Sequence, residues 1–315
     1  MSLQNLKTIT SNAQIVWNVL NGIFVIYKPK SVHYLQVKDT ILKKLCEDLN
    51  KMNVRPPGKY ISIEGATNKQ MDVVVRPSYA DHPLVVGPRY QEADFRLLNI
   101  NRIESNTSGV LVLGLNDGIK KGIQIKQARH PSIYRIKGVL GQATTNYLKT
   151  GKIIEKSTYK HVTRGSIDRL CAAMHTSHQQ NMFKLCGLDI QSQAAYELAV
   201  EGPLRPANTE VPLLYAIQCI EFKSPEFSLE VVCINENENY LASLIHNIGI
   251  ELRATATCSQ IQCTKFGLFD LNLAMLKKHW NLQNIYNNMQ QTEEIIKRNP
   301  NIIRPCKSVL TEVNK

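Results

Sequence analysis

A loop that carries opposite charges and runs directly into an apolar strand constrains this chain more than any other stretch. It spans residues 101–114, where Arg102 and Glu104 precede small polar residues, Gly109 and the apolar run 110–113. This pattern predicts a polar loop followed by a buried strand. Loops held by a rigid strand are where chemistry is usually placed. The alternative is a surface ion pair at a strand entrance, which the local pattern alone favours.

Two other β-rich runs carry polar residues of interest. Residues 22–30 stop at Pro29 and predict a strand that leads into a loop with Lys28 at its mouth. A solvated lysine at a strand end is the alternative. Tyr134 begins the run 134–142, and taken alone it is interpreted as a buried strand tyrosine.

Periodicity and capping residues predict several further elements. Residues 39–52 place apolar side chains on one helical face, with Asp39 as the N-cap, and Thr163 caps a helix over 163–175. Other predicted elements are helices over 118–129, 273–280 and 282–297, a β-hairpin of 213–222 and 227–234, and short strands and loops over 59–90 that form an insertion over one side of the site.

The charge of the chain indicates a polyanionic partner. Its 315 residues carry a net charge of +12 with a pI near 9.3, while 43% hydrophobic and 20% charged residues are ordinary for a globular protein. A folded basic surface suits nucleic acid or an anionic membrane, and a basic soluble protein is the alternative. No apolar run approaches the ~18 residues of a membrane span. A basic adaptor for proteins or membranes is a third class, but no long amphipathic basic helix supports it.

The cysteines and histidines predict neither disulfides nor a metal site. Eight cysteines occur without a Cys-x-x-Cys pair, and most lie in apolar runs. We therefore expect reduced core residues and no zinc site. The pair His175 and His178 lacks a second ligand pair at suitable spacing.

Residues 1–21 have the composition of a mitochondrial targeting segment in most respects. The first acidic residue is Asp39, and hydroxyl residues occur before it. These features predict a targeting segment over 1–21. The absence of arginine counts against it.

Several segments, in order, resemble the TruB-type RNA pseudouridine synthases, and above all their animal mitochondrial branch. The opening loop resembles the Arg-Leu-Asp active-site segment of that family, and Lys28 with Pro29 resembles its Gly-apolar-Lys-Pro segment. Tyr134 matches the tyrosine at the start of an equivalent strand. The further matches are Leu140, Gly141, Thr144 and Gly151, helices over 194–202 and 240–249, and strands within 252–264.

The resemblance implies an α+β pseudouridine synthase fold, with a mixed, mainly antiparallel sheet, flanking helices and a central RNA-binding cleft. The catalytic domain would span residues 22–285. A C-terminal helix and tail would follow over 286–315, with no additional RNA-binding β-domain.

The resemblance also implies an activity and a site. Enzymes of the family isomerise uridine within RNA: they break its glycosidic bond, turn the base and rejoin it through carbon. Glu104 stands at the nucleophile position, and Tyr134 would stack on the base. Lys28 and Arg102 would bind substrate. Neither a metal nor a diffusible cofactor is required. RNA is the expected partner, whether messenger, transfer or ribosomal, together with RNA-processing proteins.

Two departures leave the activity open. The family's nucleophile is an aspartate where Glu104 stands, and Ala242 occupies the position of the arginine that pairs with it. A carboxylate displaced by about 1 Å can lose ~100-fold in rate. One hypothesis is a pseudouridine synthase with a poor nucleophile. The other is an inactive RNA-binding protein in mitochondrial RNA processing.

Overall fold

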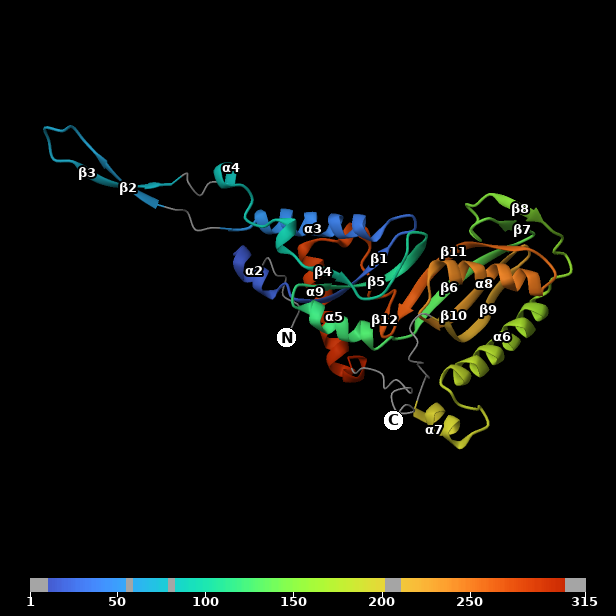
Figure 1. Cartoon of the computed structure of the whole chain (residues 1–315). Helices are drawn as coiled ribbons and strands as arrows, with labels where there is room; N and C mark the ends of the chain where they lie inside the picture. The colour runs from blue at the N-terminus through green and yellow to red at the C-terminus, as the bar shows by residue number, and fades with distance from the viewer. Residues whose placement is uncertain (1–10, 55–58, 79–82, 202–210, 304–315) are drawn as a thin grey trace.

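An eight-stranded mixed sheet forms the centre of the protein in the computed structural model (Figure 1). The structure describes residues 11–54, 59–78, 83–201 and 211–303. The strand order is β1-β5-β11-β6-β10-β9, with β4 beside β5 and β12 beside β11. Every pair is antiparallel except β5 with β11. The strands are β1 Gly22–Lys28, β4 Leu97–Asn99, β5 Thr107–Leu115, β6 Ser132–Leu140, β9 Leu213–Lys223, β10 Glu226–Ile234, β11 Ala256–Phe266 and β12 Phe269–Asp270.

The predicted α+β architecture is confirmed. The two smaller sheets are hairpins of β2 with β3 and of β7 with β8. The remaining elements are β2 Lys59–Glu64, β3 Asp72–Pro77, β7 Gln142–Thr144, β8 Ile153–Lys156, α2 Ala13–Val19, α3 Tyr34–Asn50, α4 Pro83–Val86, α5 Gly118–Gln127, α6 Arg164–Leu185, α7 Gln193–Glu201, α8 Glu238–Glu251 and α9 Leu282–Arg298, with 3-10 turns η1 Glu92–Asp94, η2 Lys277–His279 and η3 Pro300–Ile302.

Burial along the strands explains why these residues form the sheet. All nine residues of β5 are buried, as a central strand with helices near it requires. Strand β6 alternates instead: Tyr134 and Ile136 are buried, whereas Arg135 and Lys137 are exposed. One face of β6 therefore belongs to the core, and the other presents cations to solvent.

Helices complete the core on either side of the sheet. Helix α8 packs on β11, α6 packs on β9, and α9 packs on β1 (Figure 1). Seven cysteines lie within the described residues, and all seven are free and buried. No helix of the described residues is both long and apolar enough to cross a membrane.

Three local predictions need correction. Helix α3 begins at Tyr34 and is capped by His33, whose ring accepts from the Leu35 amide at 3.3 Å, so Asp39 is not its N-cap. The predicted helix over 273–280 contains only the short turn η2. The segment 59–90 does form short strands, but the β2–β3 hairpin extends away from the sheet (Figure 1).

Core residues also lie outside the predicted catalytic domain of residues 22–285. Residues 1–10 of the predicted targeting segment lie outside the described residues, but Ala13, Val16 and Leu20 are fully buried. At the other end, the Asn288 side chain accepts from the Val25 amide at 2.7 Å, and the Thr292 hydroxyl donates to the Ile23 carbonyl. The core therefore includes both α2 and the whole of α9.

Candidate functional site

The candidate site is the loop between β4 and β5, where two opposite charges meet. A guanidinium nitrogen of Arg102 lies 2.9 Å from a carboxylate oxygen of Glu104. The Arg102 side chain is 73% exposed and that of Glu104 is 33% exposed. The structure thus brings together two of the four predicted site residues and leaves the carboxylate in reach of a ligand.

A buried side chain holds this loop at one end, and a backbone hydrogen bond holds it at the other. Before the ion pair, buried Asn101 donates to the Val110 carbonyl and accepts from the Val112 amide, both at 2.9 Å. After it, the Ser31 amide donates to the Ser105 carbonyl at 2.8 Å. A loop fixed in this way can hold a reactive group in one geometry.

Lys28 holds the loop through hydrogen bonds to its backbone carbonyls. Its side chain is fully buried, so the alternative of a solvated lysine is wrong. Its ammonium donates to the carbonyls of Thr107, Ser105 and Pro29 at 2.9, 3.1 and 3.2 Å. Burial lowers its pKa to about 8, and the nearby Glu238 carboxylate partly opposes that shift. In this structure Lys28 fixes the loop, and its predicted contact with substrate stays a prediction.

Glu238 is a loop anchor that the sequence reasoning missed. It is the first residue of α8 and is buried, next to the N-cap Asn237. Its carboxylate accepts from the Asn106 amide at 2.9 Å, the Asn106 side chain at 2.6 Å and the Thr107 hydroxyl at 3.1 Å. A carboxylate at a helix N-terminus is also favoured by the helix dipole. Helix α8 is therefore tied directly to the Glu104 loop.

Tyr134 lies on β6 and is 2% exposed. Its hydroxyl donates to Glu236 at 2.7 Å. Burial, reinforced by the Glu236 carboxyl, raises the pKa of Tyr134 well above its ordinary value. Burial likewise raises the pKa of Glu236, and hydrogen bonds from Ser132 and Tyr134 offset part of that rise. The phenol is thus held neutral, and its stacking on a base stays a prediction.

Strand register relates Tyr134 to the loop. Lys28 pairs with Gly109, Gly109 with Cys263, and Cys263 with Tyr134 across four neighbouring strands. At about 4.8 Å per strand, the backbones of Lys28 and Tyr134 lie roughly 14 Å apart. Gly109 has a φ of 120°, and a Cβ there would collide with the Cys263 carbonyl. This position between β1 and β11 therefore requires glycine.

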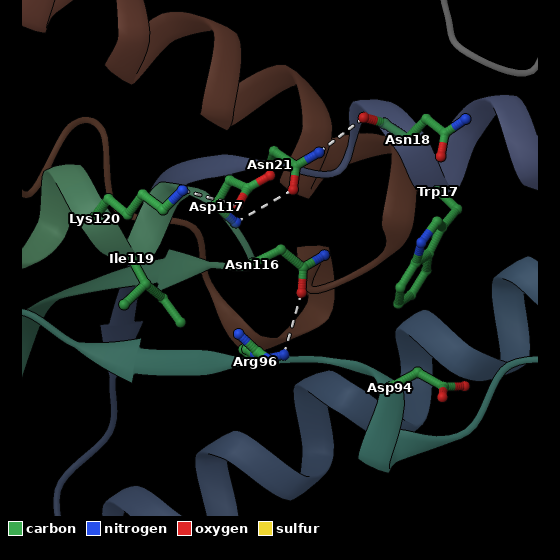
Figure 2. A pocket seen from close by; sticks show the side chains of 9 residues that line it. All are labelled: Trp17, Asn18, Asn21, Asp94, Arg96, Asn116, Asp117, Ile119 and Lys120. Atoms are coloured by element: carbon green, nitrogen blue, oxygen red, sulfur yellow. Dashed lines mark hydrogen bonds and ion pairs between the residues drawn. The ribbon is translucent and has the colours of Figure 1, made fainter.

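A cavity of about 610 Å³ lies at the far end of β5 (Figure 2). Trp17 and Asn116 line it, and the Asn116 side chain accepts from the Arg96 amide and donates to the Leu20 carbonyl. Because β5 spans nine residues, this cavity is separated from the Glu104 loop by roughly 30 Å of strand. The asparagine side chain thus stabilises backbone turns, and we assign this cavity no catalytic or binding role.

Comparison with known proteins decides the family. A family model described as TruB family pseudouridylate synthase (N terminal domain) matches residues 102–238. Mitochondrial pseudouridylate synthase TRUB2 of Xenopus tropicalis is 36% identical over 296 residues, which are 90% of each chain. TRUB2 of Homo sapiens is 37% identical over 273 residues, 84% of this chain and 82% of that one. The chain belongs to the TruB family of pseudouridylate synthases.

The resemblance to the animal mitochondrial branch is thereby confirmed. Among solved structures, an archaeal box H/ACA complex of Nop10 and Cbf5 is similar, with a TM-score of 0.44 and 12% identity. That match covers 92% of this chain and 61% of the solved one.

Ala242, at the predicted arginine position of the TruB family, is buried on α8 one helical turn after Glu238. It belongs to the apolar core and offers no charge to the loop. In this TruB protein, the cation that contacts Glu104 comes from Arg102 of the same loop.

Proposed function

We propose that this protein binds RNA in mitochondria and isomerises a uridine of that RNA to pseudouridine, with Glu104 as the nucleophile. The observation that carries the proposal is the Arg102–Glu104 ion pair of 2.9 Å on a loop anchored by buried polar groups. A carboxylate can act as a nucleophile, and the Arg102 guanidinium holds one of its oxygens in place. The mitochondrial location follows the names of the TRUB2 relatives.

The anchored loop supports a role in positioning the reactive group. Lys28 and Glu238 constrain the backbone from residue 105 to residue 107, directly after the carboxylate. Restricting the nucleophile before substrate arrives removes part of the entropy cost of the reaction. The extra methylene of glutamate still moves the carboxylate by about 1 Å, so we expect a slow enzyme.

Exposed cations near this end of the sheet support RNA as the substrate. Arg135 and Lys137 project from β6 on the face opposite buried Tyr134. The Lys30 ammonium donates to the Ser259 carbonyl, and the Ser259 hydroxyl donates to the Lys137 carbonyl. We call Lys30, Arg135 and Lys137 the basic strip. Such cations neutralise phosphates without reading sequence.

RNA binding without turnover is the second candidate. Buried Ala242 favours it, because an alanine at the predicted arginine position cannot stabilise the carboxylate. RNA-processing proteins as partners belong to this candidate, in which the fold would serve as an RNA-bound scaffold.

Single-turnover formation of pseudouridine tests the proposal. Purified protein in excess is incubated with mitochondrial RNAs transcribed in vitro, and wild type is compared with Glu104→Gln and Glu104→Asp. Glu294→Gln is the matched control, because Glu294 forms an exposed ion pair with Arg298 on α9.

We expect slow product formation by wild type and the control, none by Glu104→Gln, and faster formation by Glu104→Asp. RNA binding by wild type without product would establish the second candidate. Product from Glu104→Gln would exclude Glu104 as the nucleophile.

A further inference from the structure

The β2–β3 hairpin stands apart from the rest of the molecule. Among the described residues its two strands pair only with each other, so the outer edge of each strand is unpaired. Figure 1 shows the hairpin extending from the side of the molecule opposite α6 and β8. An isolated two-stranded hairpin is marginally stable in water and gains stability from added strands.

Four aliphatic side chains cover most of one face of the hairpin. The register pairs Ile61 with Val75 and Ile63 with Val73, so these four side chains share a face. They are 67%, 59%, 65% and 67% exposed, respectively. Adjacent exposed aliphatic residues of this kind mark an interaction surface.

The chemistry of this face points to protein and not to RNA. Its four aliphatic residues offer no aromatic ring on which a base could stack, and its one cation, Lys59, lies at the start of β2, beside the aliphatic residues and not among them. Glu64, Asp72 and Arg76 lie on the other face, where Arg76 donates to Glu64 at 2.7 Å.

The outer edge of β3 is complementary to itself. If two copies of Asp72–Arg76 pair antiparallel around Val74, each Asp72 lies opposite Arg76 of the other copy. Val73 then lies opposite Val75. Opposite charges and β-branched side chains directly across an antiparallel pair both stabilise it. The guanidinium of Arg76 has five donors, so it can retain its hydrogen bond to Glu64 and also bind Asp72 of the other copy.

This register also keeps the aliphatic faces together. Because Val74 pairs with its own copy, the two-fold axis is perpendicular to the sheet, and both hairpins turn the same face to the same side. The result is a four-stranded sheet with eight aliphatic side chains on one face. Pairing through β2 with Lys59 opposite Glu64 is less suitable, because these two residues belong to opposite faces of the hairpin and a two-fold axis perpendicular to the sheet cannot bring them to the same side.

We infer that β3 is a dimerisation strand, which pairs edge to edge with β3 of a second copy of this chain. The dimer contact lies away from α8 and the Glu104 loop, so RNA can reach both copies. The inference does not depend on turnover at Glu104.

Charge reversal on the full chain tests this pairing. Sedimentation equilibrium at micromolar concentrations compares wild type with Asp72→Arg, Arg76→Asp and the double variant. Each single change places like charges opposite each other twice per dimer, so we expect dimer dissociation constants at least about tenfold higher. The double change restores opposite charges across the axis and should restore the dimer.

A matched control is Asp117→Arg, which makes the same change in an exposed ion pair with Lys120 elsewhere on the surface. It should leave the dimer unchanged. Circular dichroism establishes that each variant is folded. A wild-type monomer at high micromolar concentration, a dimer indifferent to Asp72→Arg, or a double variant that fails to recover would each overturn the inference. A monomer that binds anionic lipid vesicles through the hairpin would assign the face to a membrane instead.

Discussion

At the scale of single residues, Lys28 is the side chain whose environment is most unusual. A fully buried ammonium is costly unless its hydrogen bonds are satisfied, and here three carbonyls accept from it. Two of those carbonyls belong to the loop that follows Glu104. The charge of Lys28 and the conformation of the loop are therefore coupled.

This coupling predicts a pH dependence of stability. Burial lowers the pKa of Lys28 from 10.5 to about 8, so between these values the unfolded chain binds more protons than the folded one. The stability contribution of Lys28 is thus present above pH 10.5 and is lost as the pH falls through 8. Relative to Lys28→Met, wild type should gain up to about 1.4 kcal/mol per pH unit across this window.

Urea unfolding of both proteins between pH 7 and pH 10.5 measures this difference. Lys30→Met is the control, because Lys30 is exposed and close in sequence. A gap between wild type and Lys28→Met that stays constant with pH would mean that Lys28 keeps its ordinary pKa.

Glu238 leads to a second prediction at this scale. Glu238→Gln replaces an acceptor-only group by one that turns an amide towards the donors of Asn106. Loss of charge-assisted hydrogen bonds should cost about 1–3 kcal/mol in the free energy of unfolding. Amide hydrogen exchange should also speed up at residues 105–107. Glu251→Gln, at the exposed other end of α8, should do neither.

The roles of these two residues could not be predicted from sequence. The pairing of Arg102 with Glu104 is local, so the residue pattern indicated it. The bonds of Lys28 and Glu238 to the loop span 77 to 132 residues, and no periodicity reports such contacts. An acidic residue directly after an N-cap is typical of many helices, so its position alone did not indicate that Glu238 binds the loop.

At the scale of elements, alternation predicted the central strands well because their two sides face different surroundings. The hairpin of β9 and β10 was correct for this reason, whereas strand β5, which is buried on both sides, was indicated by its unbroken apolar run. Helix α2 was missed even though Ala13, Val16 and Leu20 have helical spacing. Its lack of acidic residues favoured a targeting segment instead.

Truncation tests where the folded domain starts. A chain that lacks residues 1–10 retains the N-terminal core residues of α2, whereas one that lacks 1–21 loses them. Removal of a single buried leucine such as Leu20 typically costs about 2–5 kcal/mol. We expect the shorter truncation to unfold near the wild-type temperature and the longer one to be strongly destabilised. Equal stability of the two in calorimetry would place α2 outside the folded domain.

At the scale of the whole molecule, the two functions that we propose use different parts of the surface. The net charge of +12 makes association with any polyanion favourable at low salt. The basic strip gives that attraction a location near the Glu104 loop, whereas the aliphatic hairpin extends from another side. We therefore expect mutations in the basic strip to alter RNA binding alone, and mutations in the hairpin to alter self-association alone.

The salt dependence of RNA affinity tests the location of the basic strip. Each phosphate neutralised on single-stranded RNA contributes a slope of about −0.7 to the logarithm of affinity against the logarithm of salt. If Arg135 and Lys137 each contact a phosphate, Arg135→Gln with Lys137→Gln should reduce the slope by roughly 1.4. Fluorescence anisotropy between about 50 and about 200 mM salt measures it. The control Lys297→Gln with Arg298→Gln removes two exposed cations of α9 and should keep the slope. An equal loss of slope in both double variants would mean that RNA responds to net charge alone, with no preferred face.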